Sequence, residues 1–466
     1  MRAALILLCL LPAFPAFAGG EAPTLVGVAR VPADAVDSQG ETLGGFGSGM
    51  MLVPGSWKPV GSGFKARVAM LPDRGWNTAG TTDYRARLQT FDVALAPDDG
   101  NPGHEGQLKL TYKGALLLTD NKGVATTGLD PVAVRPAQAG LPDLPVAANG
   151  HVSLDNESVA PAGKGGFWIG EEYGPYVYRY DAGGRMTGAI RPPDAFIPMR
   201  AGKENFSSNN PPRGTQYDSG DPDTGRQNNQ GFEGMSVSPD GRTLFVVNQS
   251  ALRQDLDPAD AKASRRNVRL LVYDIAGAPR LVHEYAVQLP TYQDGGKTGV
   301  AAQSEMLAID DHRLLLLCRD SGGGFASKRA QSLYRRIEML DLHGATDIAG
   351  RYDDRAGSIA PRGVLRADIT PVAMSDFLDL NDNAQLNRFG LHNGAPADSH
   401  DLYEKWESLA LAPAGKPGQY ILLVGSDNDF ITRHGHMAGQ DYQDEANAEV
   451  DTLVMAWRVS IPDTGH

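Results

Sequence analysis

The chain has 466 residues and a net charge of −13 at pH 7, which argues against nucleic acid and anionic membrane surfaces as partners. Its 41% hydrophobic content suffices for a substantial core, and 55 glycines and 31 prolines are typical of many short strands joined by tight turns. A small anionic substrate remains compatible with this charge, because a local group of cations can override it.

The amino-terminal segment has the features of a signal peptide. Arg2 is followed by an apolar run over residues 3–11, and Ala16-Phe17-Ala18 matches an A-x-A cleavage site. The run is too short to span a bilayer, and no later segment has the roughly 18 uncharged residues that a membrane helix needs. We therefore expect cleavage after Ala18 and a periplasmic or secreted protein, with residues 19–466 as one domain. Cys318 would then be the only cysteine, and its apolar neighbours predict a buried thiol.

From about residue 44 onward the chain reads as short strands in a repeating order. Each of four copies begins with a glutamate and a first strand, passes through a turn rich in Asp, Gly or Lys, and ends in a second strand. The copies read DNESVAPAGKGGFWIG, GFEGMSVSPDGRTLFVVNQS, QSEMLAIDDHRLLLLCRDS and KWESLALAPAGKPGQYILLVGSDND, with Glu157, Glu233, Glu305 and Glu407 in equivalent places. A third strand follows each copy, and a degenerate fifth copy precedes them near Ser48. Recurrence at intervals of roughly 70 to 100 residues, without helical periodicity, favours radial β repeats.

These repeats predict an all-β fold, a β-propeller of five to six four-stranded blades. The stretches LKLTYKGALLL and LVHEYAVQLP are expected to be outer strands. A sixth blade would come from residues 109–150 or from the strand near Leu25. A parallel β-helix is the structural alternative, but its repeats are much shorter. Long loops are expected at about 200–230, 251–267 and 324–336, the last two partly helical, and such loops commonly bind ligands.

The repeated glutamates are expected to gather at one end of the propeller. A hairpin places the start of its first strand beside the end of its second, so acidic residues after the second strands share a face with the glutamates. Carboxylates that lie close together raise one another's pKa and need a positive charge nearby. A bound metal ion would supply that charge, and ligands that are all oxygen atoms favour Ca²⁺, with Mg²⁺ as the alternative. A structural role, such as bonding the neighbouring blade's backbone, is the alternative for each glutamate. The predicted metal ligands are Glu157, Glu171, Glu233, Glu305, Glu407, Asp73, Asp427 and Asp429.

Cationic side chains occur in the same loops, and the planar fork of arginine binds phosphate or carboxylate at two points. Each cation alone is more typical of a solvated surface charge, so the prediction depends on their shared location. His434-Gly435-His436 could bind a transition metal, although a surface role is more usual for histidines in a loop. The predicted catalytic residues are Glu233, Glu305, Arg74 and Arg319, and the predicted substrate-binding residues are Arg87, Arg253, Lys328, Arg329 and Arg433.

Several stretches resemble the bacterial phytase-like domain family, which is described as having esterase-like activity. They are MLPDRGWN, YRARLQTFDV, FWIGEEYGPYVYRYDAGGR, GFEGMSVSPDGRTLFVVNQS, and WESLALAP with LLVGSDNDF. Together they extend from about Gly44 to Val459, and the EEYGP and FEGMSVSPDG blocks are the most specific. The resemblance implies an exported propeller and, by analogy with propeller phytases, calcium-assisted phosphoester hydrolysis.

The leading hypothesis is therefore a metal-dependent hydrolase of small phosphorylated or other anionic esters, monomeric and exported. The metal would polarise the ester and activate a bound water, and arginines would stabilise developing negative charge. Two alternatives stay open. One is a lactonase of the gluconolactonase type, and the other is a non-enzymatic ligand-binding propeller with structural calcium.

Overall fold

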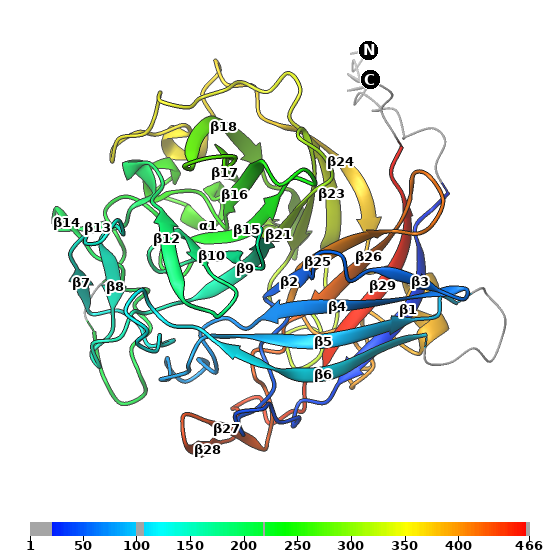
Figure 1. The fold of residues 1–466 in the computed structure, drawn as a ribbon. Coiled ribbons are helices and arrows are strands. Elements are labelled where there is room, and N and C mark those ends of the chain that lie inside the picture. Colours follow the sequence, from blue (N-terminus) through cyan, green and yellow to red (C-terminus); the bar gives the residue numbers. More distant parts are fainter. Residues whose placement is uncertain (1–20, 99–106, 218–219, 463–466) are drawn as a thin grey trace, which may run out of the picture.

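The computed structural model describes residues 21–98, 107–217 and 220–462 as a propeller of five blades (Figure 1). The predicted signal peptide and its cleavage site lie outside the described residues. None of the helices in the described ranges has the length and apolarity that crossing a bilayer requires.

Each blade is a four-stranded antiparallel sheet in which the inner strand comes from one repeated unit. From inside to outside, the first blade has β2 (Gly49–Leu52), β4 (Gly63–Leu71), β5 (Arg87–Leu95) and β6 (Leu108–Leu117), with β3 (Lys58–Val60) paired to β4. The second has β9 (Asn156–Pro161), β10 (Phe167–Glu171), β11 (Val177–Tyr180) and β12 (Met186–Ile190), and the third has β15 (Phe232–Val237), β16 (Thr243–Asn248), β17 (Asn267–Asp274) and β18 (Arg280–Gln288). The fourth has β21 (Ala302–Ala308), β22 (Arg313–Arg319), β23 (Arg335–Asp341) and β24 (Ala373–Asp379).

The fifth blade joins the two ends of the described chain. Its strands, from inside to outside, are β25 (Trp406–Pro413), β26 (Gln419–Ser426), β29 (Thr452–Ser460) and β1 (Thr24–Val31). The strand near Leu25 is therefore the outer strand of this blade, and β6 is the outer strand of the first. Neither is left to build a sixth blade in the described ranges, so the propeller has five blades.

The connections between strands carry short hairpins and single helical turns. The hairpins are β7 (Ala133–Arg135) with β8 (Leu144–Val146), β13 (Met199–Arg200) with β14 (Lys203–Glu204), β19 (Thr291–Asp294) with β20 (Lys297–Val300), and β27 (Gly435–Met437) with β28 (Gln440–Tyr442). The helical turns are α1 (Ala261–Ser264), α2 (Asn383–Leu386), η1 (Asp194–Phe196), η2 (Arg253–Asp255), η3 (Pro361–Gly363) and η4 (Asn387–Phe389). The loop at 251–267 is partly helical, as predicted, whereas 324–336 is irregular before β23 begins.

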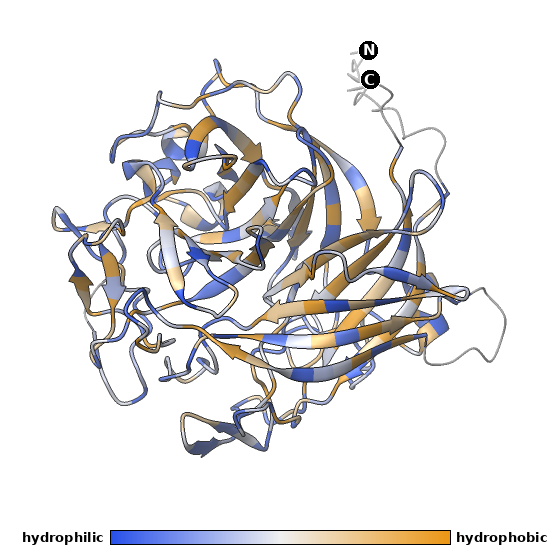
Figure 2. Ribbon diagram, in the orientation of Figure 1, coloured by the Kyte–Doolittle hydropathy of each residue, from blue (hydrophilic) through white to orange (hydrophobic). Residues whose placement is uncertain are grey.

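Five hydrophobic clusters fill the five interfaces between neighbouring blades. The cluster between the third and fourth blades, for example, contains Phe245 and Val247 on one side and Leu314 and Leu316 on the other. Cys318 is fully buried in this cluster, as its apolar neighbours predicted. Figure 2 shows hydrophobic residues along the blade strands and hydrophilic residues in many of the connections. Burial on both faces of each sheet is what holds the ring together.

Candidate functional site

The repeated glutamates occupy irregular positions at the start of the inner strands. In β9, β15 and β25 the residue without a partner on the neighbouring strand is Glu157, Glu233 and Glu407, respectively. Such a β-bulge turns its side chain out of the regular alternation of the strand. In β21 the unpaired residue is Ser304 rather than Glu305. The fourth copy is therefore offset by one residue relative to the other three.

This offset removes Glu305 from the acidic site. Its carboxylate accepts hydrogen bonds from the backbone N–H groups of Met235 (3.2 Å) and Met306 (2.8 Å). It also lines a cavity of about 130 Å³ between the inner strands, together with apolar residues such as Met50, Met235 and Leu409. Glu305 thus links the inner strands β15 and β21 through hydrogen bonds to their backbones. This is the structural role, bonding to the backbone of the neighbouring blade, that was the alternative to metal binding for each glutamate. Its predicted catalytic and metal-binding roles have no support in this geometry.

One group of three acidic side chains comprises Asp155, Glu157 and Glu172, whose oxygens lie within 4.8 Å of one another. All three residues are buried at the start of β9 or just after β10. Arg74 lies beside them, with its Nη1 atom 2.9 Å from Asp155 Oδ2. Neither oxygen of Asp155 accepts a well-formed hydrogen bond from the described residues, and the same holds for Glu172 Oε2. We call these three residues the Asp155 cluster.

The backbone around the Asp155 cluster is shaped for close approach. Gly231, the first residue of the GFEG motif, donates its N–H to Glu172 Oε1 at 2.9 Å. A Cβ atom at this position would lie 2.5 Å from the backbone of Glu172, so only glycine fits. Glu171, a predicted metal ligand, instead accepts hydrogen bonds from the N–H groups of Asp155, Tyr173 and Gly174. It therefore positions the backbone of Asp155 rather than joining the cluster.

A second acidic group comprises Asp73, Asp427 and Asp429, from the ends of β4 and β26. Lys405 is its counter-ion, with Nζ 2.6 Å from Asp429 Oδ1 and 3.7 Å from Asp427 Oδ2. The remaining oxygens also have partners. Tyr403 donates to Asp429 at 2.6 Å, and Ser48 donates to Asp427 at 3.0 Å. The second group therefore has a lysine counter-ion and hydrogen-bond partners from the protein itself, although burial and the neighbouring carboxylates still raise the pKa of Asp427 well above its usual range.

Burial and mutual repulsion perturb the protonation of both groups. Burial raises the pKa of Glu172 to about 8, with Asp155 adding to the shift, and it raises the pKa of Asp73 to about 7 against the opposing charge of Lys405. Burial, followed by the charges of Glu233 and Asp155, raises the pKa of Glu157 well above its usual range. The pKa of Asp429 is lowered, because Lys405 and Tyr403 together outweigh its burial. The Asp155 cluster thus places three carboxylates beside Arg74, whose single charge does not balance them.

Glu233 and Glu407 extend the acidic region without belonging to either group of three. Burial, then Glu172 and Glu407, raises the pKa of Glu233 well above its usual range, and its Oε2 atom has no hydrogen-bond donor among the described residues. Glu407 forms an ion pair with Arg319, and its other oxygen lies 3.8 Å from Lys405. Arg74 and Arg319, both predicted catalytic residues, are therefore the arginines that contact these carboxylates.

The predicted substrate-binding cations are not gathered at this site. Arg87 is buried and bound to Asp37 and Glu41, so its guanidinium has no group left for a substrate. Arg253 binds the carbonyl of Pro222, Arg329 pairs with Asp320, and Arg433 pairs with Glu449 on the surface. Lys328 is exposed. Each of the four arginines is held by partners in its own part of the chain. The prediction that these cations gather at one place to bind an anionic substrate therefore has no support in the structure.

Sequence reasoning missed Asp155, Lys405 and Tyr403, and it placed Glu172 at the same end of the propeller without predicting it as a metal ligand. A signal for two of them was present, because Asp155 and Lys405 each stand two residues before a repeated glutamate. Residues two apart lie on the same side of a regular strand. The equivalent positions in the other copies are Gly231 and Gln303, so this position differs in every copy and does not stand out as a repeat.

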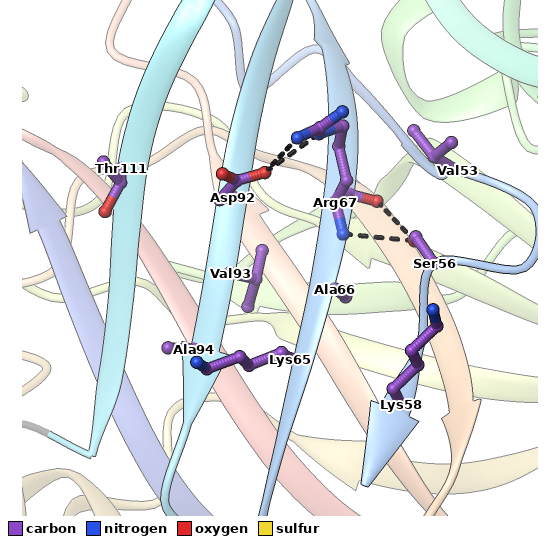
Figure 3. Close-up of a pocket in the computed structure, with 10 residues that line it drawn as sticks. All are labelled: Val53, Ser56, Lys58, Lys65, Ala66, Arg67, Asp92, Val93, Ala94 and Thr111. Atoms are coloured by element: carbon purple, nitrogen blue, oxygen red, sulfur yellow. Dashed lines mark hydrogen bonds and ion pairs between the residues drawn. The ribbon is translucent and has the colours of Figure 1, made fainter. Parts of the chain in front are cut away.

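A pocket of about 450 Å³ lies away from the acidic site, on the sheet of the first blade (Figure 3). It is lined by residues of β3 to β6 and their connections, and Arg67 within it binds Asp92 at 2.9 Å. Lys58 stands directly opposite Lys65 on the paired strands β3 and β4. The pocket shares no residue with the acidic groups and has no part in the site described above.

The fold and site define a five-bladed β-propeller with a buried acidic centre at one end of its inner strands. The chain belongs to the phytase-like family, since the family model described as "Esterase-like activity of phytase" matches residues 64–430. An uncharacterized secreted protein of Arthroderma benhamiae is 42% identical over 451 residues, which cover 88% of this chain and 87% of that protein. This relative is fungal, so the family is not confined to bacteria. A solved luciferin-regenerating enzyme aligns with 93% of this chain and 96% of its own, but at 10% identity and a TM-score of 0.29 it supports no argument. Family membership indicates a hydrolase of the phosphatase or esterase kind.

Proposed function

We propose that this protein is an exported hydrolase of small phosphorylated or other anionic esters that depends on a divalent cation, calcium in the first instance. One observation carries the proposal: the buried oxygens Asp155 Oδ1 and Glu172 Oε2 have no hydrogen-bond donor among the described residues, and the three carboxylates of the Asp155 cluster share one ion pair, that of Asp155 with Arg74. Burying a charged group without a partner raises the free energy of the folded state. A bound cation would remove this penalty for the unpaired oxygens. Oxygen-only ligands favour Ca²⁺ or Mg²⁺ over zinc.

The Asp155 cluster fits such an ion better than the second acidic group does. Asp155, Glu157 and Glu172 would hold it, whereas Lys405 already serves Asp427 and Asp429. When bound, a calcium ion would polarise the ester and lower the pKa of a coordinated water. Arg74 would fix Asp155 in place and present positive charge to an anionic substrate. Glu233, with its raised pKa, would hold a proton on its carboxyl group for the leaving oxygen.

An activity panel on the chelator-treated protein tests this proposal. Phosphate monoesters, simple carboxylic esters and sugar lactones are each assayed with calcium, with magnesium and with chelator. We expect ester hydrolysis that calcium restores and chelator removes. Opening of lactones without phosphate or ester turnover would instead establish the lactonase alternative. Calcium binding without any turnover would establish a ligand-binding propeller with structural calcium.

The stability of the ion-free protein should fall as pH rises from about 4 to 8. Glu172 and Asp73 have folded-state pKa values of about 8 and 7, above their usual values of 4.5 and 3.8. The native state therefore binds more protons than the unfolded state in this window, and the free energy of unfolding decreases with pH. Calcium requires deprotonated ligands, so its stabilising effect should grow over the same range.

Thermal melts at pH 5 and pH 8, with and without calcium, measure both effects. We expect a lower Tm at pH 8 than at pH 5 in chelator, and a larger calcium-induced rise at pH 8. An ion-free Tm that increased steadily from pH 5 to pH 8 would contradict the assignment of these carboxyl groups as crowded and uncompensated.

A further inference from the structure

Two histidines lie side by side on the fourth blade, outside the acidic site. His312 is in the turn between β21 and β22, and His343 follows β23. Their ring centroids are 4.2 Å apart, with the ring planes at 56°. Leu342 donates its N–H to the carbonyl oxygen of His312 at 2.9 Å, which ties the two turns together. The fold itself therefore holds the two rings close.

An aspartate lies beside one nitrogen of each imidazole, and the contact is a hydrogen bond for His343. His312 Nδ1 lies 3.3 Å from Asp310 Oδ1, and His343 Nδ1 lies 2.8 Å from Asp341 Oδ1. A carboxylate at Nδ1 favours the proton on that nitrogen and leaves the lone pair of Nε2 free. Histidines that bind metals characteristically have such a carboxylate on their second nitrogen, because it orients the ring and increases its basicity.

The aspartates are themselves held in place, and the histidines are accessible. Asp310 Oδ1 accepts hydrogen bonds from the N–H groups of His312 and Arg313, and its Oδ2 binds the Arg313 guanidinium at 2.8 Å. Asp341 Oδ1 accepts the N–H of His343 at 3.0 Å. The side chains of His312 and His343 are 26% and 62% exposed. An ion from solvent can therefore reach them.

We propose that the Nε2 atoms of His312 and His343 together bind a transition-metal ion such as Cu²⁺ or Zn²⁺, with water as the remaining ligands. Imidazole nitrogens suit these metals, whereas the oxygen-only Asp155 cluster suits calcium, so the two sites would select different metal classes. Metal–nitrogen bonds of about 2.0 Å require the two nitrogens to lie roughly 3 to 4 Å apart, a spacing comparable with the 4.2 Å between the two ring centroids. Among the described residues, no other two imidazole rings are in contact.

Copper binding to the chelator-treated full chain tests the site, with excess calcium present to occupy the acidic centre. We expect the wild-type protein to bind one more equivalent of Cu²⁺ than His312→Ala or His343→Ala. Its electron paramagnetic resonance spectrum should show two nitrogen ligands. Asp341→Asn should weaken copper binding by about 10- to 100-fold, because the ring loses its anchor.

His283→Ala is the matched control. His283 has the same kind of aspartate anchor, with Nδ1 2.7 Å from Asp347, but no second imidazole beside it. This variant should bind copper as the wild type does. Equal stoichiometry in the wild type and the two alanine variants, or a wild-type spectrum without two nitrogens, would overturn the proposal. The spectrum needs no variant, and neither measurement depends on hydrolytic activity.

Discussion

Asp155→Asn is expected to lower calcium affinity by about 100-fold or more and to remove calcium-dependent hydrolysis. Asparagine keeps the shape of the side chain but removes one of the three carboxylates that would hold the ion, which is also the ion-pair partner of Arg74. The ion-free variant should nevertheless fold, since Glu172 and Asp73 also face Arg74. Isothermal titration with calcium, the calcium-induced rise in Tm, and kcat/KM for the best substrate measure the effect.

Asp255→Asn is the matched control for Asp155→Asn. Asp255 is fully buried and pairs with Arg269 at 3.1 Å, in the third blade and away from the acidic groups. We expect this variant to lose stability, because the buried Arg269 loses one of its two carboxylate partners and keeps only Glu284, but to keep the wild-type calcium response. If Asp155→Asn and Asp255→Asn changed the calcium response equally, the metal-binding role of the Asp155 cluster would be refuted.

Lys405→Met is expected to reduce the free energy of unfolding by about 3 to 5 kcal/mol at neutral pH, as removal of one partner from a buried ion pair does. Its ammonium group lies within 3.8 Å of carboxylate oxygens of Asp427, Asp429 and Glu407. Without it, Asp427 and Asp429 lose their lysine counter-ion, while Glu407 keeps its ion pair with Arg319. The loss should shrink as pH falls, since protonation then neutralises them, and calcium should restore part of the lost stability. Urea denaturation at several pH values, with and without calcium, measures these changes.

The control for Lys405→Met is the same substitution in an exposed pair. Lys113 lies 3.6 Å from Asp92, and both side chains are more than 40% exposed. Lys113→Met should change stability by less than about 1 kcal/mol and should respond to calcium as the wild type does. If Lys405→Met were as stable as Lys113→Met, the carboxylates of the second acidic group would not need Lys405 for stability. The stabilising role assigned to this lysine would then be wrong.

The propeller could be predicted because each blade repeats one local pattern. The glutamate, the hairpin turn and the third strand recur in order, and the structure pairs them as expected in β9 to β11, β15 to β17 and β21 to β23. The number of blades could not be settled in this way. Pairing of β1 with β29 joins residues at opposite ends of the chain, and no local pattern in either strand indicates its partner.

The composition of the site was predictable only in part. Asp73, Glu157, Asp427 and Asp429 do fall into the two acidic groups, because hairpin geometry brings strand starts and strand ends together. The departure of Glu305 depends on which residue bulges, Ser304 or the glutamate, and the local sequence does not reveal that choice. Lys405 was overlooked because a single lysine beside a tryptophan reads as an ordinary surface residue. Its carboxylate partners Asp427 and Asp429 follow a later strand, β26, so the local sequence around the lysine does not reveal them.

The pairing of β1 with β29 also bears on how the molecule assembles. The fifth blade needs strands from both extremes of the polypeptide, whereas the second, third and fourth blades are each built from contiguous segments. Contacts between residues so distant in sequence carry a large loop-closure entropy and form slowly. The contiguous blades can therefore form during synthesis or export, but an incomplete chain leaves an open arc with exposed strand edges. We expect completion of the circle to be the last and slowest step of folding.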